Sequence, residues 1–467
     1  MLLPEKQDGL TTEDRAALAT AYSAALAYRT GLPNAPARPR ISLDEAVDRY
    51  RTPLDEDGRP ATQVISEITT LADGGLHAMA APTFFGYVLG ASHPVGVAAD
   101  ALVSAWGQNA GSSTETPAIS GMERAVCDWL ISFFGLPAEC GAGLVTGASV
   151  ANFCGVLAAR NALLAAQGWD VERDGLIGAP DIPVLIGAAA HSAVTAALRY
   201  AGLGAGRAVR VATDSEGRIE VDAFARALDA CPAPPLVVLQ AGQINTGNFD
   251  RFETLIPMVK ARGGWVHVDG AFGLWATGVP ELADRCAGAQ LADSWAVDLH
   301  KFDAGVVLVR NRPSLVAALS ARGAYLPAEN AHWEPSDSTP ELSRRGRGVP
   351  SYAILRHLGR AGVREMILRH HKLARRTADR LRDEPGITVL NEVAFNQVAV
   401  CCGEGAAGDR LTRAVLKEVQ NRGKVYPSHG EWQGREIIRI SFSGYAMQEE
   451  HADLVAEEIR TAWRALG

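Results

Sequence analysis

The sequence lacks the features that define several large classes of protein. Its 467 residues include seven cysteines with no C-x-x-C pair and no Cys/His ligand spacing, which excludes a disulfide scaffold and predicts no metal site. Basic residues are not in excess, because 45 Lys and Arg face 53 Asp and Glu, so nothing resembles a footprint for nucleic acid. No G-x-G-x-x-G or Walker motif is present, so neither a dinucleotide site nor a P-loop is supported.

Signals for export or for a membrane are also missing. The opening MLLPEKQDGL has charges where a signal peptide needs an apolar core. Two uncharged stretches, residues 74–99 and 140–159, are broken by glycine and polar residues, so neither suits a lipid-facing helix. Sparse cysteines favour a reducing compartment. We therefore expect a soluble cytoplasmic protein that binds no membrane.

The central part of the chain alternates strands and helices. Between about residue 120 and residue 310, short apolar runs rich in Val and Ile alternate with helical stretches such as 150–167, 192–202 and 221–230. This pattern predicts an α/β domain with a largely parallel sheet covered on both faces, whose ligands lie beyond the carboxyl ends of the strands. The expected strands are 144–146, 183–188, 208–213, 236–240, 265–269, 294–298 and 306–310.

The two ends of the chain differ from this central domain. Thr11 and Asp14 form a capping-box pattern that opens an amphipathic helix over residues 11–30, and a second helix begins after Ser42. These helices have too little apolar content for a core of their own. After the Arg-rich segment 343–347, a long helix is followed by short strands and helices that predict a smaller α+β domain. The expected division is a helical dimerisation segment 1–80, a large domain 81–345 and a small domain 346–467.

Two charged residues end predicted strands of the central domain. Lys301 follows His300 after an apolar run, and a lysine at the end of a buried strand is costly unless its charge is used or removed. It is therefore a candidate Schiff-base lysine, the alternative being a lysine that snorkels to solvent. Asp269 ends the run Trp-Val-His-Val, and a protonated pyridinium nitrogen would supply the partner that a buried Asp needs. The alternative is an Asp that caps the next segment.

Three polar segments follow other strands of the same domain. The small-residue turn 146–149 leads into a helix, whose free N–H groups and positive dipole end suit a phosphate, although many phosphate sites look like this. His191 starts a helix after a strand and is either structural or placed flat against an aromatic cofactor. The segment 245–250, Asn-Thr-Gly-Asn-Phe-Asp, is a polar turn beyond another strand.

Taken in order, these five features resemble the group II pyridoxal-phosphate-dependent amino-acid decarboxylases, which include aromatic-L-amino-acid, glutamate, cysteine-sulfinate and histidine decarboxylases. The likeness covers most of the chain and includes Phe-Phe-Gly-Tyr at 84–87, Gln108-Asn109, the spacing from Pro117 to Glu123 and the tail 432–441. It implies an α/β protein of fold-type I, the transferase-like fold of pyridoxal-phosphate enzymes. It also implies pyridoxal 5'-phosphate as cofactor, an amino acid as substrate, and a homodimer with shared active sites.

The resemblance assigns roles to individual residues. Lys301 would carry the cofactor as a Schiff base and later move protons, and Asp269 would pair with the pyridine nitrogen so that the ring remains an electron sink. His191 would stack on one face of the ring and Ala271 would lie against the other.

Further cofactor contacts and a substrate pocket follow from the same resemblance. Ala148 and Ser149 would bind the phosphate with His300 nearby, and Thr246 would lie close to the polar edge of the ring. Asp298 occupies a position that is polar in relatives. The candidate substrate residues, whose identities suggest a pocket less purely apolar than one for indole or phenol, are Phe84, Phe85, Gln108 and Asn109.

The sequence departs from the family at two loops. The loop after Lys301 is short, which puts contacts usually assigned to it in doubt, and residues 326–343 lack the tyrosine that aromatic decarboxylases carry there. That tyrosine is thought to protonate the substrate carbon after decarboxylation. His332 is the expected replacement, with Ser338 a weaker donor, Tyr325 just outside the loop, and Lys301 or His191 as the alternative sources.

The main hypothesis is decarboxylation of an L-amino acid to the corresponding amine. The first alternative keeps the cofactor but forms an aldehyde by oxygen-dependent decarboxylation and deamination, or breaks a carbon–carbon bond. A second alternative is a catalytically silent relative that acts through its dimer surface. Lys301, Asp269 and His191 are all present, which argues against a silent protein.

Overall fold

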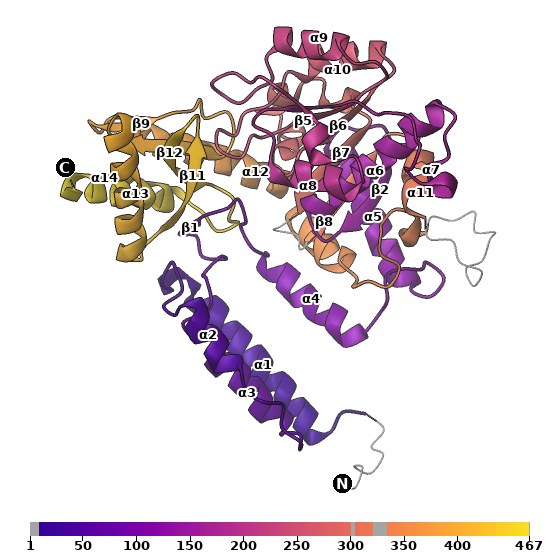
Figure 1. Cartoon of the computed structure of the whole chain (residues 1–467). Helices are drawn as coiled ribbons and strands as arrows, with labels where there is room; N and C mark the ends of the chain where they lie inside the picture. The colour runs from indigo at the N-terminus through magenta and orange to yellow at the C-terminus, as the bar shows by residue number, and fades with distance from the viewer. Residues whose placement is uncertain (1–8, 300–303, 321–333, 467) are drawn as a thin grey trace.

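Two β-sheets and a helical arm make up the molecule (Figure 1). The computed structural model describes residues 9–299, 304–320 and 334–466. The larger sheet has seven strands and the smaller has five. The helical arm at the N-terminus projects from the body below both sheets in the view of Figure 1.

The larger sheet confirms the predicted α/β domain. Its strand order is β2-β8-β7-β6-β5-β3-β4, and β8 runs antiparallel to both of its neighbours while the remaining pairs are parallel. The strands are β2 (Gly141–Val145), β3 (Val184–Gly187), β4 (Val209–Val211), β5 (Leu236–Gln240), β6 (Trp265–Asp269), β7 (Ser294–Leu299) and β8 (Ala304–Val309). The carboxyl ends of β3, β5, β6 and β7 therefore meet at one edge.

Helices cover both faces of this sheet, as the apolar strands require. Side chains alternate along β5, so that Leu236 and Val238 pack on one core and Val237 and Leu239 on the other. The first core is closed by α6 and α8, and the second by α5, α9, α10 and part of α12 (Gly348–Arg382). The helices around the sheet are α5 (Pro117–Phe133), α6 (Ala148–Ala166), α7 (Val171–Asp174), α8 (Ser192–Tyr200), α9 (Val221–Asp229), α10 (Phe252–Ala261) and α11 (Arg312–Leu319).

Helix α6 is the most apolar of these elements. Within the described residues, it is the one helix that is long and apolar enough to cross a membrane. However, 67% of its apolar window is buried inside the protein. Its apolar surface is therefore used against the sheet, as expected for a core helix.

The smaller sheet has the order β1-β11-β12-β10-β9. Strand β1 pairs in parallel with β11, so residues 84–85 belong to the small sheet although we expected them in the large domain. Strand β11 was not predicted from the sequence, because Pro427 and Gly430 weaken its strand pattern. The elements are β1 (Phe84–Phe85), β9 (Ile387–Val389), β10 (Gln397–Cys402), β11 (Tyr426–Trp432), β12 (Arg435–Ser441), α12 (Gly348–Arg382, kinked at Gly359), α13 (Gly405–Arg422) and α14 (Glu449–Leu466).

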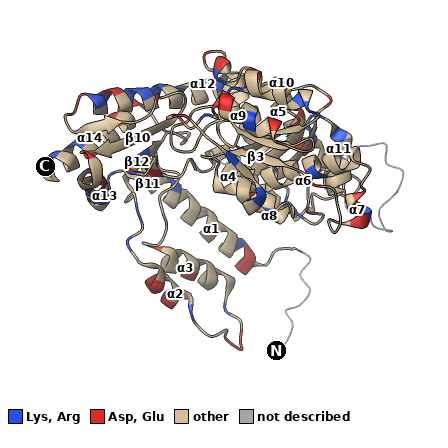
Figure 2. Ribbon diagram, turned by 45° about the horizontal axis from the view of Figure 1, so that its top comes forward, with Lys and Arg blue, Asp and Glu red and all other residues tan. Residues whose placement is uncertain are grey.

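The N-terminal arm is a hairpin of helices with an apolar outer surface. A capping box of Thr11 with Asp14 opens the first helix, as predicted, and the second helix, which was expected to begin after Ser42, has a capping box of Ser42 with Glu45. Most of α1 and α3 is uncharged in Figure 2, and Leu26 and Ile68 are 70% and 52% exposed. The helices are α1 (Thr12–Gly31), α2 (Leu43–Tyr50) and α3 (Ala61–Ala72), and α4 (Pro94–Trp106) follows them.

Candidate active site

A cavity with an empty volume of about 890 Å³ opens at the carboxyl edge of the larger sheet. It is bounded by the ends of β5, β6 and β7, by the first turns of α6 and α8, and by residues of the small domain. The cavity is lined by six of the predicted site residues, which are Ala148, Ser149, His191, Asp269, Ala271 and Asp298. The described residues contain no group of three His, Cys, Asp or Glu side chains that could hold a metal ion.

Asp269 is a buried carboxylate on the wall of this cavity. It ends β6 and is 6% exposed. Its Oδ1 atom accepts two long hydrogen bonds, one from Asn152 Nδ2 at 3.3 Å and one from the Ala271 amide at 3.4 Å. Burial raises the pKa of Asp269, and the charge of His191 together with these two donors opposes that rise. The carboxylate is thus poorly solvated and would gain from a cation in the cavity.

The N-terminal turn of α6 forms the second wall. The amides of Val150 and Ala151 bond to the Gly147 carbonyl at 3.1 and 3.0 Å, so the helix begins where the cavity opens. A Cβ on Gly305 of β8 would lie 2.4 Å from the Gly147 carbonyl carbon. Strand β8 therefore presses directly on the turn, and this fixes the amides of Ala148 and Ser149 at the cavity wall. These amides have no acceptor within the helix and suit an anion.

His191 caps α8 on a third side of the cavity. Its Nδ1 atom accepts a hydrogen bond from the Ala193 amide at 3.2 Å, which fixes the direction of the ring. The side chain is exposed to the cavity. The structure therefore brings the turn at residues 146–149 (the phosphate turn), His191 and Asp269 to the same cavity, as the order of the motifs predicted.

Several predicted residues lie outside the described part of the chain. These are His300 and Lys301 and also the loop residues His332 and Tyr325. The strands on either side of Lys301 are described, and Leu299 of β7 pairs with Ala304 of β8. The connection that carries Lys301 therefore starts and ends at the edge where the cavity opens. Ser338 is described and is 1% exposed, with its carbonyl against Gly143 of β2, away from the cavity lining.

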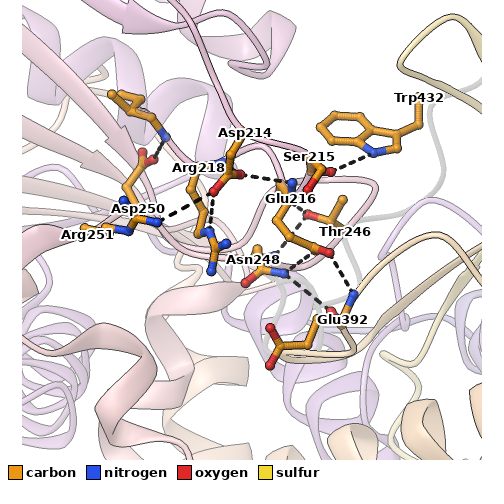
Figure 3. Close-up of polar contacts among 11 residues, drawn as sticks. Asp214, Ser215, Glu216, Arg218, Thr246, Asn248, Asp250, Arg251, Glu392 and Trp432 are labelled. Atoms are coloured by element: carbon orange, nitrogen blue, oxygen red, sulfur yellow. Dashed lines mark hydrogen bonds and ion pairs between the residues drawn. The ribbon is translucent and has the colours of Figure 1, made fainter. Parts of the chain in front are cut away.

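Thr246 differs from the expectation, because it is not part of the cavity wall. Its side chain is fully buried, and its hydroxyl donates to the Glu216 carbonyl at 2.7 Å (Figure 3). The neighbouring Ile244 lines the cavity instead. The Glu216 carboxylate in turn accepts from Asn248 and from the Glu392 amide of the small domain. Thr246 therefore belongs to a polar cluster that joins the two domains.

The predicted substrate residues also lie away from the cavity in this chain. Phe84 and Phe85 are buried in the small sheet, where the Phe84 ring stacks on Tyr426 at 5.4 Å. Gln108 donates to the Trp106 carbonyl, and the Asn109 side-chain oxygen accepts from the Arg344 amide. None of the four lines the cavity.

Two residues that follow strand β1 line the cavity where Phe84 and Phe85 were expected. Tyr87 and Val88 line the cavity with φ values of 60° and 65°. A β-branched residue in this region is unusual and costs about 1–3 kcal/mol. This backbone conformation turns the chain toward the cavity immediately after β1. No pattern of residue types in the sequence predicts such a turn. The other lining residues that the sequence reading missed are Asn152, Ala193, Gln240, Gly242, Phe272, Trp275, Ile367, His370, Phe395 and Asn396.

The cavity fits pyridoxal phosphate. The first turn of α6, which Gly305 contacts at Gly147, offers amide donors for the phosphate. Asp269 faces the same cavity, and its Oδ2 atom meets no donor among the described residues. A protonated pyridine nitrogen would supply the cation that this carboxylate lacks. Ala148 and Ser149 would hold the phosphate, Asp269 the nitrogen, and His191 and Ala271 would lie at the ring.

Comparison with known proteins agrees with this chemistry. The family profile of the pyridoxal-dependent decarboxylase conserved domain matches residues 47–402. Phenylacetaldehyde synthase of Arabidopsis thaliana is 25% identical, covering 86% of this chain and 85% of that protein. Tryptophan decarboxylase 1 of Oryza sativa subsp. japonica is 25% identical with 94% and 90% covered, and rat (Rattus norvegicus) aromatic-L-amino-acid decarboxylase is 23% identical with 93% and 94% covered.

Solved structures share the fold. The Oryza sativa TDC structure with PLP and tryptamine superposes with a TM-score of 0.90 at 22% identity and covers both chains fully. Tryptophan decarboxylase of Catharanthus roseus in complex with L-tryptophan gives 0.87 at 17% identity, covering 99% of this chain and all of that one. This confirms the expected fold-type I architecture. The chain belongs to the pyridoxal-dependent decarboxylase family and is a pyridoxal-phosphate-dependent carboxy-lyase that acts on an amino acid.

Proposed function

We propose that the substrate is an L-amino acid with an aromatic side chain and that the main product is the amine. The cofactor chemistry rests on the buried Asp269 carboxylate, which shares a cavity with the start of α6, and the choice of side chain rests on the apolar part of the same cavity. The apolar side chains on the remaining wall, Phe272, Trp275 and Phe395, favour an aromatic substrate over a charged one. Relatives named for tryptophan and for aromatic amino acids support the same choice.

The residues of this chain have separate tasks in the reaction. Bound pyridoxal phosphate supplies an electron sink for the electron pair that the departing carboxyl group leaves behind. Asp269 holds a proton on the pyridine nitrogen, and the first turn of α6 binds the phosphate. His191 holds the ring from one face, and Lys301 supplies the amine that carries the cofactor and moves protons near the substrate carbon.

An amino-acid panel tests this assignment. Carbon dioxide and amine should form with aromatic L-amino acids, and glutamate and cysteine sulfinate should give little of either. The Lys301→Ala variant should fold but lose turnover and the visible absorbance band of the bound cofactor. Unchanged absorbance and rate in that variant would contradict the assignment. Turnover of acidic substrates alone would contradict the aromatic preference.

A second candidate is the aldehyde-forming reaction, to which the name of the phenylacetaldehyde synthase of Arabidopsis thaliana refers. It is favoured by the absence of tyrosine from residues 326–343. We propose instead that His332 provides the acid that commits the reaction to amine. His332→Phe should then lower amine formation and raise aldehyde, ammonia and peroxide, whereas Ser338→Ala should change neither rate nor product ratio. An unchanged product ratio in His332→Phe would assign the proton to another group.

We also propose that the protein works as a homodimer. The helices α1 and α3 expose Leu18, Tyr22, Leu26, Val64 and Ile68 on an arm that projects from the body. Burying such a surface against a second copy would stabilise both. Deletion of residues 1–40 should expose apolar surface and cause dissociation or aggregation.

Point substitutions give a sharper test of the dimer. Leu26→Asp should shift sedimentation from dimer to monomer, because the charge would lie in the interface. Leu54→Asp is the matched control, since Leu54 is fully exposed but lies between the helices rather than on α1 or α3. A fully active monomer in either the wild-type or the truncated protein would contradict the proposal.

We propose a reducing, cytoplasmic compartment for the protein. All seven cysteines are free and buried, which supports this choice. Fractionation of the source cells, followed by thiol labelling of the unfolded protein, tests it. A labelled count below seven in freshly isolated protein would indicate oxidation and contradict the proposal.

A further inference from the structure

A fully buried histidine lies two residues before Asp269 on the same strand. His267 has no exposed surface, and burial lowers its pKa to about 3, so the ring is neutral at physiological pH. Side chains alternate along a strand, so His267 and Asp269 point to the same face of β6, which α6 covers. Neither the sequence motifs nor the reaction described above gives this histidine a task.

The hydrogen bonds around His267 fix the position of its proton. Asn152 Nδ2 lies 3.0 Å from the Ala148 carbonyl and 3.3 Å from Asp269 Oδ1, and both of these oxygens can only accept. The Asn152 amide group is therefore oriented with its Oδ1 toward His267 Nε2, at 2.9 Å. Because Asn152 Oδ1 can only accept, His267 Nε2 carries the proton.

The other side of the imidazole is fixed in the same way. His267 Nδ1 must be the acceptor, and Ser294 Oγ of β7 donates to it at 2.8 Å. Trp265 Nε1 in turn donates to Ser294 Oγ at 2.9 Å. A continuous series of donors therefore runs from Trp265 through Ser294, His267 and Asn152 to Asp269, and each bond has one possible direction.

The fold provides the space that this series needs. A Cβ on Gly155 of α6 would lie 2.4 Å from His267 Cε1 and 2.6 Å from Nδ1, so only glycine permits the imidazole here. A leucine or phenylalanine at position 267 would fill the same buried space without polar atoms that need partners. The chain has instead a buried polar series, which is favourable only when every member is satisfied.

We propose that His267, acting through Asn152, is a positioning residue that orients the Asp269 carboxylate toward the cofactor nitrogen. Both donors to Asp269 reach Oδ1, so Oδ2 is the oxygen left to face the ring nitrogen. Asn152 also bonds to Ala148 in the phosphate turn, so one side chain links the two ends of the cofactor site. This role rests on the proposed pyridoxal-phosphate function, and it assigns to His267 and Asn152 the orientation of the carboxylate that holds the ring nitrogen.

The test compares two cofactors in the full-length apoprotein. Pyridoxal phosphate needs Asp269 to hold its ring nitrogen protonated, whereas 1-deazapyridoxal phosphate has carbon at that place. His267→Leu should weaken pyridoxal phosphate binding by about 10- to 100-fold, the effect of losing hydrogen-bond support to a charged group, and should leave binding of the deaza analogue little changed. The nitrogen-15 chemical shift of labelled bound cofactor should move toward that of an unprotonated pyridine.

His267→Gln is the matched control. Glutamine can place an amide N–H toward Asn152 and an oxygen toward Ser294, so both affinities and the nitrogen shift should stay near wild type. Should His267→Leu fail to fold, Asn152→Ala removes the donor to Asp269 from within a helix and should give the same selective loss.

The outcomes separate the inference from the function on which it rests. An equal loss of both cofactors, or an unchanged nitrogen shift in a folded His267→Leu protein, would make the histidine purely structural and overturn the inference. Wild-type protein that binds neither cofactor would overturn the pyridoxal-phosphate assignment itself. A selective loss restored by glutamine would support both.

Discussion

Two buried aspartates close to the carboxyl edge of the larger sheet differ in how they are solvated. Asp250 is 5% exposed and Asp269 is 6% exposed, so burial does not distinguish them. Asp250 accepts two short bonds, from the Ile219 and Gln240 amides at 2.7 Å each, one at each oxygen. Asp269 accepts two long bonds at a single oxygen and faces the cavity.

The comparison shows how a structural carboxylate differs from a cofactor-binding one. Backbone amides satisfy both oxygens of Asp250, which ties the hairpin at residues 213–219 to β5 beside the polar cluster of Figure 3. Asp269 keeps one oxygen for a partner that the polypeptide does not supply. Burial raises the pKa of Asp250 to about 6 and also raises that of Asp269, so a raised pKa alone does not mark a functional site.

The largest expected effect is that of Asp269→Asn. The variant should fold and bind pyridoxal phosphate at least as weakly as His267→Leu, and at saturating cofactor its kcat should fall by at least about a hundredfold, because no carboxylate stabilises the protonated ring nitrogen. Steady-state kinetics with circular dichroism as the folding control measures this. A near-normal kcat would make Asp269 a structural residue like Asp250.

Asp250→Asn should show the opposite behaviour. Asparagine replaces one acceptor with an NH2 group that faces a backbone N–H, so the free energy of unfolding should fall by about 1–3 kcal/mol. Turnover per folded, cofactor-loaded molecule should stay near wild type. Denaturant titration alongside kinetics separates the two quantities, and a selective loss of turnover would place Asp250 in the catalytic machinery.

The raised pKa of Asp250 predicts a pH effect on stability. Burial raises the pKa of this carboxyl group from its ordinary value of 3.8 to about 6, so the folded protein binds more protons than the unfolded chain between these values. The stabilising contribution of the bound proton is therefore lost as the pH rises through about 6. The Tm of the wild type, measured against Asp250→Asn, should increase as the pH falls from about 8 to about 5. A difference in Tm that is constant with pH would contradict the raised pKa.

The smallest expected effect is that of Thr246→Val. Loss of the hydroxyl removes the hydrogen bond that it donates to the Glu216 carbonyl and the longer one that it accepts from the Asn248 amide, which together cost about 1 kcal/mol, and leaves the cavity wall unchanged. Calorimetry should show a small fall in Tm, and a titration should show unaltered cofactor affinity. A clear loss of cofactor affinity would return Thr246 to the site that the sequence suggested.

Strand positions in the larger sheet were readable from the sequence, because their side chains are apolar on both faces. The predicted ranges 236–240 and 265–269 match β5 and β6 without a shift. Strands β1 and β11 were missed for different reasons. The first has two residues, and the second contains Pro427 and polar residues on a sheet that is only partly buried.

The site was readable where a residue's place follows from the end of a strand. Asp269 and His191 reach the cavity because the strands before them stop at the same edge. Phe84 and Thr246 were also predicted to line the site, but neither does. Phe84 lies in the two-residue strand β1 and Thr246 lies in a turn, and the local backbone conformation brings their neighbours Tyr87 and Ile244 to the cavity instead.

The sequence alone determined the fold class, the order of the motifs and the presence of a carboxylate at the end of a buried strand, since these depend on local pattern and on connectivity. Only the tertiary structure decided which polar groups support that carboxylate. His267 and Asn152 are 115 residues apart and meet because α6 packs over β6 at Gly155. Such a contact depends on the approach of two elements and on the direction of each side chain, which residue types in one chain segment do not specify.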